Sequence, residues 1–288
     1  MGELHHKLIK LVDRMPAFPK SVHRVLQLTA DINFRPKDLI QVIDHDPVLT
    51  VKILKLVNSA YFGLSRSIMS INQAAVFVGI NTIKNLTLTV ATSGMLPLKG
   101  NTPLGTDDFL LHALATATIS KRLAMRLGVS EIHASDFFVA GLLHDFGKVV
   151  FSQFMPREFD LAIHTAEERQ IGLHQAEQAV IGADHAEVGA MLGEKWQLPT
   201  ALVTSIRNHH HTGPDEESLE PAGQMLSDCV QAGNSIAQKM ELGQSGSPVQ
   251  APFTARMEQR FGCDLDSLIN SLTNLTEEIE KTRIFMHL

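Results

Sequence analysis

Cysteine is scarce in this sequence: only Cys229 and Cys263 occur among 288 residues. Two cysteines cannot build a disulfide framework, and they lack the paired spacing of a zinc ribbon. We therefore expect no metal–thiolate site. So little cysteine fits a reducing compartment, and we expect a cytoplasmic protein.

Long apolar runs are missing as well. The longest, residues 74–80, is far shorter than the ~20 residues that a membrane-spanning helix requires. The N-terminus has neither the basic flank nor the apolar core of a signal peptide. No stretch alternates apolar and polar residues long enough to form a strand. We therefore expect an all-α protein that does not contact a membrane.

The remaining composition is that of a globular protein, with 44% apolar and 19% charged residues, and the length suffices for about two domains. The charge is uneven. Residues 1–100 hold 12 Lys and Arg against 6 Asp and Glu, whereas the other 188 residues hold 13 against 25. The first third is thus +6 and the rest −12.

The sequence predicts several helices within the first hundred residues. Asp46 can cap a helix that begins at Pro47, because its side chain can accept hydrogen bonds from the free N–H groups of the first turn. Proline suits the first position of a helix, since it has no N–H group that would be left without a partner there. Apolar residues crowd this helix so closely that we expect most of its circumference to be buried. Ser70 and Gln73 predict a capping box before another helix.

The later part of the chain also predicts helices. One runs over residues 107–127, and a single helix runs over residues 134–153. After a polar linker over residues 241–252, apolar residues at intervals of three and four predict one amphipathic C-terminal helix. We expect a two-lobed helical bundle: an N-terminal lobe over residues 1–100, a second lobe over residues 101–240, and a linker with a C-terminal helix over residues 241–288.

The most informative stretch is residues 139–148, an apolar run that ends in His144, Asp145 and Lys148. A carboxylate buried in so apolar a setting is costly unless it is ion-paired, hydrogen-bonded or bound to a metal. The metal interpretation requires more ligands elsewhere in the chain.

Side chains that could supply these ligands recur along the sequence. Asp108 and His112 stand four residues apart in a predicted helix and so share one face. Further candidates are His185, His209, His210 and Asn234, with Asp228 as an alternative to Asn234. Imidazole and carboxylate ligands together suit Zn, Fe, Mn, Ni or Co, and a set of this size could hold one ion or two. The alternative is a collapsed cluster whose groups only hydrogen-bond one another.

The order of these residues, a helical His, then His-Asp, then His, then His-His, resembles the HD superfamily of metal-dependent phosphohydrolases over residues 108–234. The resemblance implies metal ligation by Asp108, His112, His144, Asp145, His185, His209 and His210. It also implies catalytic roles for Asp145, which would help hold a metal hydroxide, and for Lys148, which would contact a substrate phosphate. Asn234 stands where the family has a closing aspartate, and an uncharged amide is a weaker ligand. We therefore expect weak metal binding.

The first hundred residues carry a second resemblance. Met15-Pro16-Ala17-Phe18-Pro19, then Asp46-Pro47, Asn58-Ser59-Ala60 and the segment 70–79 follow one another as in the HDOD family, the HD-related output domain of bacterial signalling proteins. This resemblance implies a regulatory output module, with an unknown signalling protein as its partner.

Two functions follow from these patterns. The first is a signal-transduction module with an HD-type metal site and weak or absent catalysis. The alternative is a metal-dependent phosphohydrolase or phosphodiesterase that takes a phosphate-containing ligand. The basic first third could also suggest nucleic-acid binding. We do not expect it, because Lys52 and Lys55 flank a mostly apolar helix where a recognition helix would present several base-reading side chains.

Overall fold

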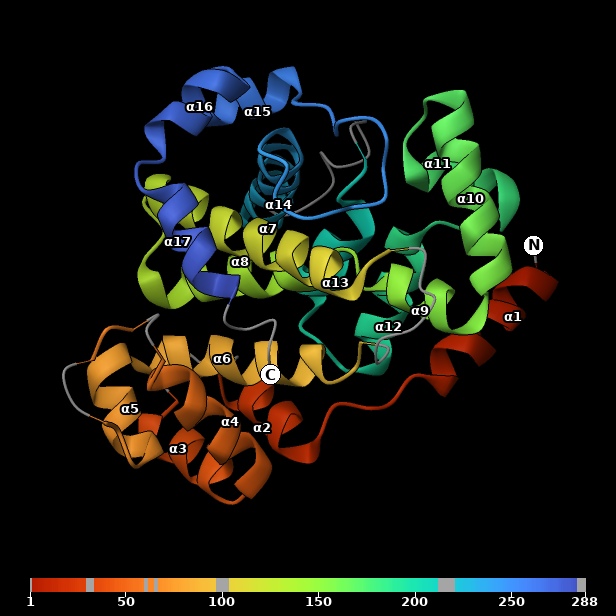
Figure 1. The fold of residues 1–288 in the computed structure, drawn as a ribbon. Helices are drawn as coiled ribbons and strands as arrows, with labels where there is room; N and C mark the ends of the chain where they lie inside the picture. Colours follow the sequence, from red (N-terminus) through yellow and green to blue (C-terminus); the bar gives the residue numbers. More distant parts are fainter. Residues whose placement is uncertain are drawn as a thin grey trace. The chain divides into compact units, whose positions relative to one another are not determined.

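The computed structural model of the protein describes residues 2–29, 34–59, 62–64, 67–96, 104–211 and 221–283. Every regular element in these ranges is a helix, and no strand occurs among them (Figure 1). The all-α prediction is confirmed. The expected boundary between the two lobes, at residues 100 and 101, lies outside the described residues.

Contacts divide the chain into two compact units. Unit 1 comprises Met1–Pro16 and Pro97–Leu275, and unit 2 comprises Ala17–Leu96 and Thr276–Leu288. The helices of unit 1 are α1 (Gly2–Arg14), α7 (Thr106–Arg126), α8 (Glu131–Leu143), α9 (Gly147–Phe154), α10 (Pro156–Arg169), α11 (Leu173–Val180), α12 (His185–Lys195), α13 (Thr200–Asn208), α14 (Pro221–Lys239), α15 (Ala255–Phe261) and α16 (Leu265–Ser271). Those of unit 2 are α2 (Lys20–Thr29), α3 (Pro36–Asp44), α4 (Pro47–Val57), α5 (Ile71–Val78) and α6 (Ile80–Ser93), while α17 (Leu275–Thr282) begins at the last residue of unit 1.

Helix α4 begins as its sequence predicts. Asp46 Oδ1 accepts from Leu49 N at 3.1 Å, and Pro47 occupies the first turn. The expectation that most of its circumference is buried is wrong. Val48 is 68% exposed and Val51 is 66% exposed, because only the opposite face, which includes Ile53, packs into unit 2. A prediction from apolar content alone therefore overestimates how much of this helix is buried.

Unit 1 is built around α7, which packs along both α8 and α14. The contact with α8 is close because Gly141 has no side chain: a Cβ there would lie 2.7 Å from Ala117 Cα. The single helix predicted over residues 134–153 is wrong, since α8 ends at Leu143 and α9 begins at Gly147. The break falls at residues 144–146 and turns the His-Asp pair out of regular helix.

The boundaries of the units differ from the expected lobes. Residues 1–16 group with unit 1 rather than with the helices that follow them. Lys195 Nζ donates to the carbonyls of Val12, Asp13 and Met15 at 2.8–2.9 Å. These bonds attach the end of α1 to the end of α12.

The C-terminal segment forms three short helices rather than one amphipathic helix. Gly262, with φ +72°, ends α15 in a left-handed conformation, and Asp264 then caps α16 by accepting from Ser267 N at 2.7 Å. Asn274, with φ +60°, separates α16 from α17. The apolar residues recur at helical intervals, but these two breaks divide the segment into three helices.

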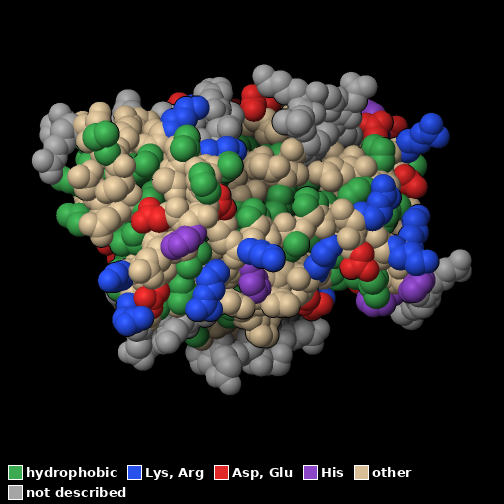
Figure 2. Space-filling model, turned by 90° about the horizontal axis from the view of Figure 1, so that it is seen from below, with side chains coloured by type: hydrophobic (Ala, Val, Ile, Leu, Met, Phe, Trp, Pro, Cys, Tyr) green, Lys and Arg blue, Asp and Glu red, His purple; other side chains and the backbone are tan. Residues whose placement is uncertain are grey.

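None of the helices in the described residues is by itself long and apolar enough to cross a membrane. Helices α5 and α6 pass that test only together, and they meet at a bend of 117°. On the face seen in Figure 2, Lys and Arg side chains lie in several separate groups among apolar and acidic ones.

Candidate metal centre

His144 and Asp145 are placed by the break between α8 and α9. His144 is the C-terminal capping residue of α8, and its Nδ1 lies 2.7 Å from Gly141 O. The imidazole donates there to a carbonyl that the end of the helix leaves free. Because Nδ1 carries the proton, Nε2 keeps its lone pair and faces Asp145.

His209 uses the same local arrangement. It caps the C-terminus of α13, with Nδ1 2.7 Å from Ile206 O. Again the helix end fixes the ring and leaves Nε2 as an acceptor. Metal-binding histidines typically have their second nitrogen held in this way.

The two remaining buried imidazoles are held by other partners. His185 opens α12, and its Nδ1 lies 2.5 Å from Glu177 Oε2, a carboxylate on α11 that is fully buried. His112 lies in α7 and is hydrogen-bonded to the backbone of Leu242, after α14. Both arrangements again leave Nε2 for the interior of the site.

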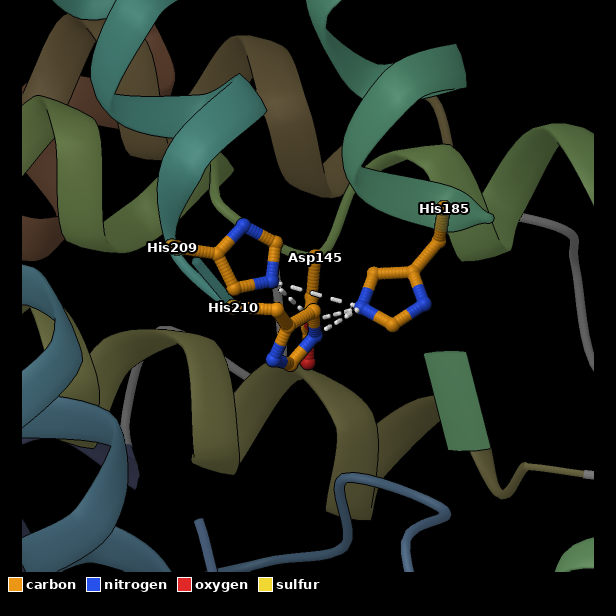
Figure 3. Close-up of side chains that lie close together, drawn as sticks. All are labelled: Asp145, His185, His209 and His210. Carbon is orange, nitrogen blue, oxygen red and sulfur yellow. Dashed lines mark hydrogen bonds and ion pairs between the residues drawn. The ribbon is translucent and has the colours of Figure 1, made fainter. Parts of the chain in front are cut away.

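Asp145 is the point on which these rings converge. Figure 3 shows His185 and His209 turned toward it. Its Oδ1 lies 3.2 Å from His185 Nε2 and 3.6 Å from His209 Nε2. Its Oδ2 lies 3.4 Å from His144 Nε2 and 3.7 Å from His112 Nε2. Ligands about 2.0–2.2 Å from one metal ion lie about 3 Å apart, so these separations suit coordination.

His210 joins the Oδ1 side. Its Nε2 lies 2.8 Å from His185 Nε2, and in Figure 3 its ring turns inward beside that of His209. The ligand atoms thus form two groups that share Asp145. One group is Asp145, His185, His209 and His210, and the other is His112, His144 and Asp145.

Protonation in the site favours metal ligation at most positions. Burial lowers the pKa of His112 to about 4 despite the nearby charge of Asp145. Burial likewise lowers the pKa of His144, His209 and His210. These four imidazoles are therefore neutral at neutral pH, as metal ligands must be.

His185 and Asp145 differ from these four groups. Burial alone would lower the pKa of His185, but the charge of Glu177 raises it to about 9. Burial alone would raise the pKa of Asp145, but His144 and Lys148 hold it well below its usual range. Asp145 is thus an anion, and His185 would have to lose a proton to solvent before its Nε2 could bind a metal.

Several buried atoms at this centre lack a hydrogen-bond partner: His112 Nε2, His144 Nε2, Asp145 Oδ1 and Asn234 Oδ1. Leaving such groups unsatisfied is costly in a protein interior. All four are atoms of a kind that can bind a metal, and they belong to one cluster, because His112 contacts both Asp145 and Asn234. The residues present therefore fit a metal ion.

Lys148 also contacts this centre. Its Nζ donates to Asp145 Oδ2 at 2.6 Å and to Ser245 O at 2.8 Å, and the side chain is only 3% exposed. Ser245 belongs to the segment between α14 and α15, which was predicted only as a polar linker. That segment therefore forms one wall of the site.

Two predicted carboxylates lie apart from the centre. Asp108, expected to be a ligand, is exposed in the first turn of α7 and belongs to neither group of ligand atoms. There the acidic side chain stabilises the positive end of the helix. Asp228, the alternative to Asn234, is ion-paired with Arg256 and Arg260. The structure brings the other predicted residues together.

The sequence reasoning missed Glu177 and His174. Glu177 occupies the same helix face as the buried Leu173, which is an unusual position for a charge and the signal that could have revealed it. His174 is not among the histidines that the sequence suggests as ligands. Its ring stacks on His210, with centroids 4.1 Å apart, and both line a cavity of about 250 Å³ with residues of the segment 247–252.

Comparison with known proteins identifies the family. A family model described as "HDOD domain" matches residues 15–212. The chain belongs to the HDOD family. Asn234 and the segment that carries Ser245 lie after the matched residues.

Similar proteins extend this result. An uncharacterized protein of Treponema pallidum (strain Nichols) is 29% identical over 214 residues, which are 73% of this HDOD chain and 40% of that protein. The chain thus spans about two fifths of the length of this curated relative. An HDOD domain protein with unknown function from Geobacter sulfurreducens has the same fold, with a TM-score of 0.76, 24% identity and coverage of 96% of this chain and 97% of that chain.

A candidate phosphohydrolase from Shewanella amazonensis SB2B superposes with a TM-score of 0.73 at 25% identity, with 97% of each chain covered. A candidate signal transduction protein from Marinobacter aquaeolei VT8 gives a TM-score of 0.82 at 21% identity, covering 99% of this chain and 65% of that chain. These two proteins share the fold of this HDOD chain. Their descriptions differ, since one names a phosphohydrolase and the other a signal transduction protein.

Proposed function

We propose that this HDOD chain is a regulatory signal-transduction module that holds a metal ion at Asp145 and catalyses hydrolysis weakly or not at all. The observation that carries the metal site is the convergence of four buried imidazole Nε2 atoms on one carboxylate, at 3.2–3.7 Å. The metal would be iron, Mn, Zn, Ni or Co, which suit imidazole and carboxylate ligands.

Two features favour the regulatory role. Asn234 contributes an uncharged amide where the HD superfamily has an aspartate. Lys148 is already engaged by Asp145 and Ser245, so it would have to break two hydrogen bonds to reach a substrate phosphate. The partner would be a separate signalling protein whose contact responds to the state of this site.

One observation favours the alternative, a metal-dependent phosphohydrolase. The cavity of about 250 Å³ beside His209 and His210 is lined by polar side chains, including His174 and Gln175. It is slightly smaller than the 300–1,000 Å³ usual for ligand sites, so it suits a small phosphate-containing ligand. A metal in such a site lowers the pKa of bound water and neutralises phosphate charge.

Hydrolysis assays on the metal-loaded full chain separate the two functions. We expect turnover of generic phosphodiesters and nucleotides at background, and tighter metal binding with some hydrolysis in Asn234→Asp. The matched control is Asn270→Asp, which adds the same charge at an exposed position on α16 and should change neither property. Robust hydrolysis by the unmodified chain, abolished by Asp145→Ala and by Lys148→Ala and not increased by Asn234→Asp, would establish the enzyme instead.

A further inference from the structure

A second cavity lies in unit 2, and none of its lining residues belongs to the metal centre. Its volume is about 760 Å³, within the 300–1,000 Å³ usual for ligand sites. Its lining residues belong to α2, to α3 and to the turns next to these helices. The charged side chains among them are three cations and two carboxylates: Lys20, Arg24, Arg35, Asp38 and Asp46.

Both carboxylates are already engaged within the protein. Asp46 Oδ2 accepts from Ser21 Oγ at 2.6 Å, and its Oδ1 accepts from Leu49 N at 3.1 Å, where it caps α4. Asp38 forms a bidentate pair with the Arg35 guanidinium, with two hydrogen bonds of 3.0 Å. Neither carboxylate is ion-paired with the other two cations of the cavity.

Those two cations, Lys20 and Arg24, have no ion-pair partner in the part of the chain that the structure describes. Arg24 donates only to the neutral amide of Gln27, at 3.3 Å. The two cations stand four residues apart on α2, so their charges repel each other along one face of the helix. Lys20 also lies in the first turn, where no acidic residue offsets it and the helix dipole opposes a cation. A bound anion would offset both costs.

The rest of the lining suits more than a simple anion. Leu28 and Val42 form an apolar part of the wall. His45 Nδ1 donates to Gln41 O at 2.6 Å, which leaves Nε2 as an acceptor for a hydroxyl group. The side-chain amide of Gln41 can both donate and accept. The cavity therefore combines two cations with an apolar wall and with neutral polar groups.

We propose that this cavity binds a nucleoside monophosphate. At neutral pH a phosphomonoester carries a charge of about −1.5 to −2, which matches the charges of Lys20 and Arg24, and a guanidinium can hold two phosphate oxygens at once. The nucleobase would lie against the apolar wall, and a ribose hydroxyl would donate to His45 Nε2. A regulatory module would thereby receive a small-molecule input in unit 2. The proposal does not depend on metal binding, because the cavity shares no residue with the metal centre.

Isothermal titration calorimetry on the full chain tests this proposal. The titrations contain EDTA, so that the metal centre cannot hold a phosphate through a metal ion. AMP, GMP, CMP and UMP are compared with their nucleosides and with inorganic phosphate, each of which carries only one part of a nucleotide. We expect at least one of these nucleotides to bind at one site per chain, and its nucleoside and phosphate to bind at least about tenfold more weakly.

Two variants test the cations. Lys20→Met and Arg24→Met should each weaken nucleotide binding about tenfold or more, since each removes a hydrogen bond to a charged group. Without nucleotide, neither variant should have a lower melting temperature, because each removes the repulsion along α2. A purely structural role of these side chains would lower it. The control is Lys37→Met, at an exposed lysine of α3 that does not line the cavity, and it should change neither property.

Three results would overturn the proposal. The first is that none of the four nucleotides binds. The second is nucleotide binding that both Lys20→Met and Arg24→Met leave unchanged. The third is that inorganic phosphate or a phosphoserine peptide binds as tightly as the best nucleotide, which would mean a simple anion site or a docking site for a partner protein. Each of these results would leave the proposed metal binding intact.

Discussion

Asp145 organises the candidate site at the scale of single residues. Four of the imidazoles around it, those of His112, His144, His185 and His209, are each fixed through one nitrogen and present the other to it. Two of the fixing partners are helix-end carbonyls, at Gly141 and Ile206, and therefore follow from where α8 and α13 end. A further partner is the backbone of Leu242, which holds His112. The last, Glu177, is a charge that the fold buries completely.

Glu177 gives a prediction at this scale. In Glu177→Gln, a neutral amide replaces the carboxylate behind His185, so the imidazole loses basicity and its fixed orientation. We expect metal affinity to fall about 10–100-fold, the usual effect of losing such a partner. Competition with a chromophoric chelator measures the change.

The control for Glu177→Gln is Glu167→Gln, on the exposed side of α10, where the side chain is 60% exposed. It should leave metal affinity unchanged. If Glu177→Gln folds and its metal affinity is within about twofold of that of the unmodified chain, the role assigned to Glu177 is contradicted.

At the scale of elements, the ends of helices matter more than their interiors. The sequence predicted most helices from apolar periodicity, and it predicted the start of α4 from Asp46 and Pro47. It did not predict the break at residues 144–146, because apolar residues on both sides continue the helical pattern. The break depends on contacts across the fold: a Cβ at Gly147 would overlap the carbonyl oxygen of His185, so α9 and α12 approach too closely for any side chain.

Helix α15 gives the prediction at this scale. Its Arg256 and Arg260 are ion-paired with Asp228 of α14, whose side chain is fully buried. Asp228→Ala removes the carboxylate that is ion-paired with both guanidinium groups. A fully buried pair would cost about 3–5 kcal/mol. The arginine side chains are 34% and 24% exposed, so we expect a loss of about 2 kcal/mol in the free energy of unfolding.

Urea unfolding measures this loss, and Asp266→Ala is its control. Asp266 forms an exposed pair with Lys239 at 2.5 Å and is itself 73% exposed. Removing it should cost less than about 1 kcal/mol. Equal losses of unfolding free energy in the two variants would mean that the ion pairs of Asp228 do not stabilise the packing of α15 on α14.

At the scale of the whole molecule, the site draws on segments that are far apart in the sequence. The histidines were predicted from their order along the chain, because a metal site needs several ligands and these residue types supply them. The contribution of Ser245 could not be predicted. A Gly- and Ser-rich segment gives no local sign that its carbonyl will meet a lysine 97 residues away. Asp108 was predicted and lies outside the site, since helical spacing gives a shared face but not burial.

The central claim is that the cluster around Asp145 binds a metal ion, and anomalous diffraction tests it most directly. Crystals of the full chain grown with Mn²⁺ or Zn²⁺ would be measured at the absorption edge of the metal. We expect an anomalous peak within the cluster, at a coordination distance of about 2.0–2.3 Å from the Asp145 carboxylate and from neighbouring imidazoles, and its loss in Asp145→Ala. A well-ordered cluster with no anomalous peak at saturating metal would contradict it.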